Sequence, residues 1–257
     1  MNEAVVARLR EAGCVYAEEE ARLLLANFRN VAQLEPAVQR RETGEPLEHV
    51  LGYAVFCDLR IAVHRPVFIP RRRAEGLAKA AVDEVRSSRR GDTWFLDLGC
   101  GSGAIAATVV SATESSKVWA SDVSAEAVAC ARLNAARYGY TVVLSDWWTQ
   151  LPRELAGSLD VVAAYLPHVP DARVHDVPTD YRRAEEERAW RGGNDGLSAL
   201  RSVLPGLGNW LAPTGVFMTL LAREQVAQAA ASAREQGWAV TSREVDDENS
   251  SLLCLRN

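Results

Sequence analysis

A glycine-rich turn at residues 99–103 constrains the fold more than any other feature of the sequence. It follows an apolar run at residues 95–98 and leads directly into a helix-like run that begins at Ala104. Glycines let the backbone turn tightly and let a ligand approach without interference from a Cβ atom. The helix that follows directs free N–H groups at such a ligand. The pattern therefore predicts a ligand-binding strand–turn–helix unit, and the alternative is a turn of purely structural purpose.

Strand-like and helix-like runs alternate from about Arg73 onward. The expected strands are Trp94–Leu98, Val118–Ser121, Val142–Leu144, Val161–Ala164 and Val216–Leu221. The expected helices are Ala74–Ser87, Ala104–Ser111, Ala125–Tyr138, Leu197–Leu207 and Glu224–Gln236. The last two runs, Ala239–Val245 and Leu252–Leu255, predict an antiparallel pair joined by the polar segment Asp246–Ser251. The alternation predicts an α/β fold with a mostly parallel seven-stranded sheet, an antiparallel C-terminal strand and helices on both faces.

The first part of the chain has a different pattern. Apolar residues recur at helical spacing between Ala21 and Phe28, and the whole stretch before Gly44 favours short helices. It is too short to bury a sizeable core alone. The run from Val55 to Val63 is β-prone and predicts a hairpin with Asp58 in its turn. The expected domains are an N-terminal helical domain at 1–45, a β-hairpin linker at 46–72 and a large α/β domain at 73–257.

Charge and composition exclude several classes of protein. The chain has 257 residues and a formal net charge of −5, which disfavours a nucleic-acid partner because such binding needs many contacts from Lys and Arg to phosphates. No apolar run approaches the roughly 20 residues of a membrane span. The N-terminus lacks a secretion signal, so a cytoplasmic location is expected. Five scattered cysteines without a Cys-x-x-Cys pair predict buried thiols rather than a metal site or a disulfide framework.

The spacing of the glycines distinguishes two classes of nucleotide-binding turn. Dinucleotide-binding enzymes usually carry Gly-x-Gly-x-x-Gly, with the third glycine inside the helix. Here the spacing is tighter, and the acidic Asp97 lies in the preceding strand. This arrangement resembles motif I of the class I methyltransferases, which implies their Rossmann-like fold and their cofactor, S-adenosyl-L-methionine. The residues of this motif that would bind the cofactor are Asp97, Gly99, Cys100, Gly101 and Gly103.

Two further acidic residues stand at the ends of expected strands. Asp122 lies where a carboxylate accepts hydrogen bonds from both ribose hydroxyls, although Asp122 or Ser124 could equally cap the next helix, and the two roles are compatible. By the methyltransferase resemblance, Asp146 would bind the adenine amino group and the next side chain would pack on the ring. Core or surface packing is the alternative for Trp147 and Trp148. The residues assigned here to cofactor binding are Asp122, Val123, Asp146 and Trp147.

The resemblance narrows to one family and covers nearly the whole chain. Residues 44–52, 56–60 and 67–73 resemble the linker of the release-factor glutamine N5-methyltransferase family, and residues 192–197 resemble its Gly-Gly-x-Asp-Gly-Leu motif. The resemblance implies methylation of a protein substrate such as a release factor. The linker residues that it places in the cofactor pocket are Phe68 and Pro70.

One motif departs from this family. Its substrate motif is Asn-Pro-Pro-Tyr, in which the Asn side chain and a neighbouring backbone carbonyl accept the hydrogens of the substrate amide and orient its nitrogen. Only Pro167 remains of it here, in Tyr165-Leu166-Pro167-His168. Tyr165 cannot reproduce the reach of a carboxamide, whereas the carbonyl of Leu166 still can serve. His168 is a candidate general base, and the alternative is a loop histidine without that role. These four residues are the candidate catalytic group, and Tyr165 is also a candidate cofactor contact.

Other charged and substituted positions leave alternatives open. The run from Arg71 to Arg73 suggests either phosphate binding or, as we favour, a solvated, salt-bridged face. The acidic residues Asp176, Asp180 and Glu185–Glu187 suggest a solvated helix start or lid, or a site for a cationic substrate. Leu220 and Val55 occupy positions where the glutamine methyltransferase family has acidic residues, so the sequence departs from the family pattern at these positions as well.

Three functions are consistent with these patterns. The first is a methyltransferase derived from the glutamine family, with another protein side chain or a small metabolite as acceptor, or still the release-factor glutamine. The second is a non-catalytic relative that binds the cofactor or another protein. The third, methylation of a nucleic-acid base, is disfavoured by the lost motif and the net charge. The sequence leaves the oligomeric state open.

Overall fold

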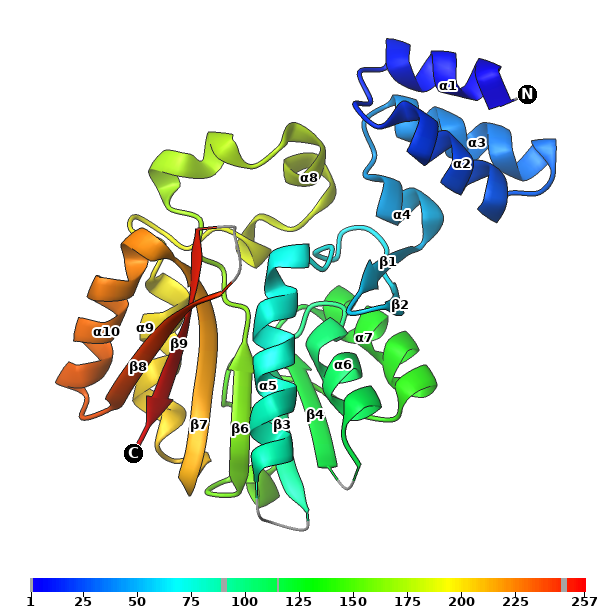
Figure 1. The fold of residues 1–257 in the computed structure, drawn as a ribbon. Coiled ribbons are helices and arrows are strands. Elements are labelled where there is room, and N and C mark those ends of the chain that lie inside the picture. Colours follow the sequence, from blue (N-terminus) through cyan, green and yellow to red (C-terminus); the bar gives the residue numbers. More distant parts are fainter. Residues whose placement is uncertain (1, 89–91, 115, 246–248) are drawn as a thin grey trace.

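A single large sheet organises the molecule (Figure 1). The computed structural model describes residues 2–88, 92–114, 116–245 and 249–257. The sheet has the strand order β5-β4-β3-β6-β7-β9-β8, in which β3 to β7 pair in parallel and β9 is antiparallel to both of its neighbours. Its strands are β3 (Thr93–Leu98), β4 (Ser116–Asp122), β5 (Thr141–Leu144), β6 (Leu159–Ala164), β7 (Leu211–Ala222), β8 (Ala239–Val245) and β9 (Ser250–Arg256). The predicted mostly parallel α/β sheet with an antiparallel C-terminal strand is confirmed.

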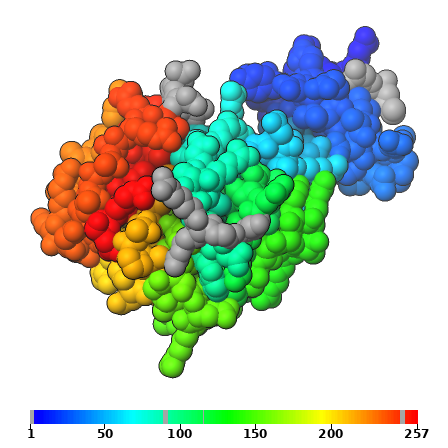
Figure 2. All heavy atoms as spheres, turned by 60° about the horizontal axis from the view of Figure 1, so that its bottom comes forward, coloured from blue at the N-terminus to red at the C-terminus, as the bar shows by residue number. Residues whose placement is uncertain are grey.

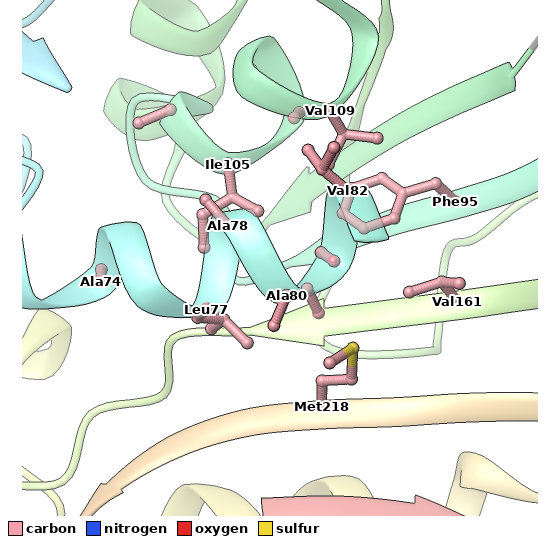
Figure 3. Packing of buried hydrophobic residues seen from close by; sticks show 14 of the residues in the cluster. Ala74, Leu77, Ala78, Ala80, Val82, Phe95, Ile105, Val109, Val161 and Met218 are labelled. Atoms are coloured by element: carbon pink, nitrogen blue, oxygen red, sulfur yellow. The ribbon is translucent and has the colours of Figure 1, made fainter. Parts of the chain in front are cut away.

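Helices cover both faces, as the alternation predicted. They are α5 (Glu75–Ser87), α6 (Ala104–Ala112) and α7 (Ala125–Tyr138), then α9 (Ser198–Leu207) and α10 (Val226–Glu235). On the face covered by α5 and α6, Phe95, Val161 and Met218 of three neighbouring strands meet Val82 and Val109 of the two helices (Figure 3). All five side chains are buried, which removes their apolar surface from water.

The opposite face packs against α9 and α10. Leu96 follows Phe95 by one position, and Phe217 precedes Met218 by one position. Both pack with Leu204 of α9 and Ala233 of α10 in a second cluster. Successive side chains of a strand point to opposite faces, so a strand buried on both sides needs apolar residues at every position. This requirement explains why the strands read as continuous apolar runs.

Strand β7 begins earlier than its apolar run predicted. It starts at Leu211 rather than Val216 and pairs with β6 across a register shift between Leu159 and Val161. A Cβ atom at Gly215 would lie 2.6 Å from the Leu159 carbonyl oxygen, so the absence of a side chain permits this approach. The predicted closing antiparallel pair is confirmed as β8 and β9. Residues 246–248 of the polar connection lie outside the described residues.

The N-terminal helices form a cluster of their own beside the sheet. They are α1 (Asn2–Glu11), α2 (Ala17–Asn27), α3 (Val31–Glu42) and α4 (Leu47–Leu51), and Figure 2 shows them as a lobe next to the body that holds the sheet. Leu9, Leu24 and Val38 are fully buried at their centre. Across the lobe, Arg8 donates to both Glu35 and Glu42. The division into three domains stays a prediction.

The expected hairpin connects the lobe to the sheet. Its strands are β1 (Tyr53–Phe56) and β2 (Leu59–Ala62), and Cys57 and the predicted turn residue Asp58 have φ values of 46° and 61°. The buried Asn134 of α7 holds the hairpin in place, because it accepts from Ala62 N at 2.8 Å and donates to Ala62 O at 2.9 Å. The same amide nitrogen donates to Ser102 O, so one side chain joins the linker to the glycine turn.

Two further features of the described residues are the length of their helices and the state of their cysteines. No helix among them is long and apolar enough to cross a bilayer. The five cysteines are free thiols, and two of them, Cys14 and Cys130, are buried.

Replacing Leu24 by alanine is expected to destabilise the N-terminal lobe without destabilising the sheet. The side chain is fully buried in a cluster separate from those of the sheet. Leucine-to-alanine changes at such positions cost about 2–5 kcal/mol. Hydrogen exchange should show faster exchange in α1–α3 and unchanged exchange in β3, β6 and β7. The matched control is Tyr16→Ala, whose side chain is 69% exposed. Equal loss of protection across the sheet would contradict an independent lobe.

Candidate functional site

A cavity of about 230 Å³ lies at the carboxyl ends of β3, β4, β5 and β6. Parallel sheets with this strand order bind ligands at the carboxyl ends of their strands, next to the topological switch point, which here lies between β3 and β6. The predicted cofactor contacts that line it are Phe68, Pro70, Asp97, Gly99, Cys100, Gly101, Asp122, Val123, Asp146, Trp147 and Tyr165. Gly103 is not among the lining residues. A Cβ atom there would lie 2.3 Å from the Tyr140 hydroxyl oxygen, so Gly103 makes room for Tyr140 instead.

The glycine turn is fastened to the end of β4. The N–H groups of Gly99 and Cys100 both donate to the Ser121 carbonyl, at 2.8 Å and 2.9 Å. Gly99 and Gly101 have φ values of 73° and 54°, which residues other than glycine rarely adopt. A Cβ atom at Gly101 would meet nothing within 4 Å, so this backbone borders open space where a ligand can approach.

Asp122 is the polar centre of the cavity. Its Oδ2 accepts from Gly101 N at 2.8 Å and its Oδ1 accepts from Ser124 N at 2.9 Å. Burial raises the pKa of this carboxyl, while the two backbone N–H groups act in the opposite direction. Ser124 is the N-cap of α7, because its Oγ accepts from Ala127 N. Of the two residues offered as helix caps, Ser124 therefore caps the helix with its side chain, which leaves Asp122 facing the cavity.

Asp97 forms a second buried carboxyl in the cavity wall. Its Oδ2 accepts from Ala106 N at 3.0 Å, in the first turn of α6. Complete burial raises the pKa of Asp97 to about 7, above the ordinary value of 3.8. The carboxyl is therefore balanced between its neutral and ionised forms near neutral pH.

The two neighbouring tryptophans have different roles. Trp147 has a φ of 46° and lines the cavity beside Gly99, where a Cβ atom would lie 3.5 Å from the Trp147 ring. Ser145 Oγ donates to the Trp147 carbonyl at 2.8 Å and holds this turn. Trp148 packs on the core, stacked on Trp210, and its Nε1 donates to Val203 O. Both tryptophans pack against the second core cluster, but only Trp147 also lines the cavity.

Arg71 is held in the cavity wall by two rings and a buried acid. Its guanidinium lies 4.4 Å from the Phe68 ring centroid and 4.0 Å from that of Tyr181. Its Nη2 donates to both oxygens of Glu185 at 2.7 Å, and Glu185 Oε1 also accepts from Ile69 N. The expected salt-bridged face is present at Arg71, which pairs with Glu185, but its side chain is only 17% exposed, so the solvated part of the expectation is wrong there. Arg72 and Arg73 are exposed.

The solvated surface expected for the acidic segment is present at Asp176 and Glu187, which are exposed, but not at Glu185. These residues lie in η3 (Asp171–Asp176), α8 (Thr179–Ala184) and η4 (Glu187–Ala189) and between them. Each carboxylate has an arginine partner in the structure, so none is a bare site for a cationic substrate. The pairs are Asp176–Arg173, Asp180–Arg41, Glu185–Arg71, Glu186–Arg188 and Glu187–Arg191. Glu185 is buried rather than solvated, because the segment folds back onto the linker.

The candidate catalytic turn is divided between the cavity and its support. Tyr165 and Pro167 line the cavity, whereas Leu166 is buried and neither Leu166 nor His168 is among the lining residues. His168 Nδ1 lies 2.9 Å from the Leu166 carbonyl oxygen, and since a carbonyl only accepts, Nδ1 carries the hydrogen. Loss of hydration lowers the pKa of His168 and favours the neutral ring. The His168 ring meets the Tyr165 ring edge-on, at a centroid distance of 5.3 Å.

The glycine motif at residues 192–197 supports the backbone of the turn at residues 165–168. Gln225 Nε2 donates to the carbonyl oxygens of His168 and Asp195, at 2.8 Å and 3.1 Å. A Cβ atom at Gly196, which has a φ of 78°, would lie 2.3 Å from the His168 carbonyl oxygen. Gly192 N also donates to Val169 O. The motif therefore fixes the backbone of the turn and does not itself line the cavity.

Sequence reasoning missed several lining residues. Glu186, Arg188 and Ala189 reach the cavity from the segment after β6, and Pro66 and Val67 reach it from the linker. No spacing rule connects them with the glycine turn. The acidic run was visible in the sequence, but which of its members faces the cavity depends on how the segment folds back.

Comparison with known proteins agrees with this geometry. A model of the methyltransferase domain matches residues 95–184. The release factor glutamine methyltransferase of Gloeobacter violaceus is 35% identical over 69% of this chain and 62% of its own length. That of Caulobacter vibrioides is 30% identical over 85% of this chain and 81% of its own length. A crystal structure of a methyltransferase from Pyrococcus furiosus matches with a TM-score of 0.56 at 16% identity, over 77% of this chain and 89% of that one, and this likeness shows the fold alone.

The matches differ in how much of each relative they cover. The chain spans 62% of the length of the Gloeobacter violaceus relative and 66% of one from Moorella thermoacetica. The cofactor of this class of domain is S-adenosyl-L-methionine, and the cavity fits it. The backbone at Gly101 borders open space, the Asp122 carboxylate lines the cavity and Val123 is an exposed apolar side chain, so these residues fit a ligand with hydroxyl donors and an apolar ring.

Replacing Asp122 by alanine is expected to weaken binding of S-adenosylhomocysteine by about 10-fold to 100-fold, because hydrogen bonds to a charged acceptor are lost. Calorimetry of the wild type and the variant measures the two affinities, and circular dichroism verifies that both are folded. Equal affinities would remove Asp122 from the cofactor site.

Asp97 is expected to make stability depend on pH. A carboxyl whose folded pKa is raised to about 7 stabilises the fold fully below about pH 4 and loses that contribution as the pH rises through 7. Asp97→Asn keeps an acceptor for Ala106 N but does not titrate. The free energy of unfolding of the wild type should therefore fall relative to that of Asp97→Asn between about pH 4 and about pH 7, as urea titrations would measure. A difference that stays constant with pH would contradict the assignment.

Proposed function

The chain belongs to the release factor glutamine methyltransferase family, and from that premise we propose that it transfers a methyl group from S-adenosyl-L-methionine to an acceptor other than the release-factor glutamine. The acceptor class is a nucleophilic side chain of another protein or a small metabolite. The observation that carries the proposal is the turn from Tyr165 to His168 at the cavity wall. A release-factor-like protein partner and a cytoplasmic location remain part of the proposal.

The change at Tyr165 affects how an amide would be held. An amide nitrogen is a poor nucleophile, because its lone pair is delocalised into the carbonyl, so the family's motif uses two acceptors to orient it. Here a rigid ring stands in place of the carboxamide, and it packs between His168 and Phe68. This packing favours a shaped, partly aromatic wall over a pair of hydrogen-bond acceptors.

The Leu166 carbonyl is also changed in its surroundings. Its oxygen already accepts from His168 Nδ1 at 2.9 Å, which occupies one of its two lone pairs. A substrate amide would have to share this acceptor with the imidazole. Both elements of the amide site are therefore altered together, which supports a changed acceptor over a simple loss of one contact.

The remaining residues support catalysis by positioning. S-adenosyl-L-methionine, when bound, supplies a methyl group on a sulfonium that is open to in-line displacement. Asp122 and the glycine turn would hold the nucleoside end, and Tyr165 and Pro167 would shape the end that the acceptor enters. Arg71, fixed by Glu185, stacks on Phe68, whose ring in turn contacts that of Tyr165. An acceptor that is already nucleophilic, such as a carboxylate, thiolate or amine, needs no amide-orienting group.

The test is methyl transfer from labelled S-adenosyl-L-methionine to a purified release factor with its Gly-Gly-Gln loop. We expect the wild type to transfer slowly or not at all, while it still binds S-adenosylhomocysteine. The triple variant Tyr165→Asn, Leu166→Pro, His168→Tyr rebuilds the family motif and should transfer about 100-fold faster, because orientation of the nitrogen is restored.

Controls separate the possible outcomes. The same triple variant with Asp122→Ala added should lose transfer, which ties the gain to the cofactor site. Rapid transfer by the wild type would contradict the changed acceptor and would mean that Tyr165, Leu166 and His168 form a working amide site. Binding without transfer to any protein or metabolite acceptor would favour a non-catalytic relative.

A further inference from the structure

Glu186 brings a second carboxylate to the ribose end of the cavity. It lines the same cavity as Asp122 and Ser124, although it follows Ser124 by 62 residues in the chain. Glu186 Oε1 accepts from Ser124 Oγ at 3.1 Å, and Ser124 N donates to Asp122 Oδ1 at 2.9 Å. The two carboxylates therefore flank one serine, Asp122 from the end of β4 and Glu186 from the segment after α8.

The position of Glu186 is fixed without a ligand. Its N–H donates to the Pro66 carbonyl at 3.1 Å, and its Oε2 accepts from Arg188 Nε at 2.6 Å. The preceding residue, Glu185, anchors the same backbone through Arg71 and Ile69. A group whose orientation is set in advance loses little entropy on binding, which is the condition for an effective ligand contact.

Two acids at one end of a cavity need an explanation. Burial is the main cause that raises the pKa of Asp122, and the nearby charge of Glu186 raises it further. Both acids already accept hydrogen bonds from the protein, but their like charges repel each other, and further donors from a ligand would reduce that repulsion. A vicinal diol has two O–H donors, and each carboxylate oxygen keeps a lone pair beyond the contacts described above.

We propose that Glu186 is a second cofactor-binding carboxylate, which accepts a hydrogen bond from one ribose hydroxyl of S-adenosyl-L-methionine while Asp122 accepts from the other. This inference rests on the proposed function for the identity of the cofactor. It gives the segment after α8 a direct role in the cofactor site, in addition to its contacts with the linker. Arg188 then positions Glu186 by holding Oε2, while Oε1, which accepts from Ser124 Oγ, keeps a second lone pair for the ligand.

The experiment compares two ligands by calorimetry, S-adenosylhomocysteine and its 2′,3′-dideoxy form. Glu186→Ala should weaken binding of the first by about 10-fold, as expected for a hydrogen bond to a charged acceptor. It should leave the affinity for the dideoxy ligand unchanged within about twofold, because that ligand has no hydroxyl to donate. The wild type should discriminate between the two ligands more strongly than the variant does.

The matched control is Glu187→Gln, the next residue, which pairs with Arg191 and does not line the cavity. It should bind both ligands like the wild type. If Glu186→Ala lowers the melting temperature, Glu186→Gln replaces it, because the amide keeps the size of the side chain and is a weaker acceptor.

The outcomes distinguish this inference from the proposed function. A Glu186→Ala protein that binds S-adenosylhomocysteine as tightly as the wild type overturns the role of Glu186 alone. Equal losses for both ligands also overturn it, since Glu186 would then only hold the segment in place. A folded wild type that binds neither ligand overturns the proposed function as well.

Discussion

The carboxylate of Asp122, held by two backbone N–H groups, is the interaction on which the site depends. The parallel register places Leu98 beside Ser121, so the turn that follows β3 lies next to the end of β4. Gly101 can then donate to Asp122 only because its φ of 54° is accessible to glycine. A buried carboxylate without such donors would be costly, so the glycine turn and the acid stabilise each other.

Two further polar contacts attach the rest of the chain to this centre. Asn134 joins the hairpin to the glycine turn through Ala62 and Ser102, and Glu185 joins the segment after β6 to the linker through Arg71. Both groups are buried, and buried polar groups that are fully paired favour one arrangement over its alternatives. The cavity thus takes its shape from segments that are distant in sequence.

The family relationship and the chemistry of the acceptor have separate physical origins. The sheet, the glycine turn and the glycine motif at residues 192–197 determine the fold and the backbone of the turn at residues 165–168, and these features are shared with the family. In the proposed function, the side chains at Tyr165 and His168 determine which acceptor can be oriented. A fold can therefore be retained while the acceptor changes, since function depends on the site that the fold carries.

Local patterns in the sequence determined the sheet, the glycine turn and the acids at the strand ends. These features follow from side-chain periodicity and backbone freedom within a few residues, as at Gly101 and Asp122. Only the tertiary structure decided that Trp147 rather than Trp148 lines the cavity, that His168 donates to Leu166, and that Glu186 lies beside Ser124. Each of these contacts depends on how a segment folds back over the sheet. The free energy of that packing comes from contacts between residues far apart in the chain, which local patterns do not encode.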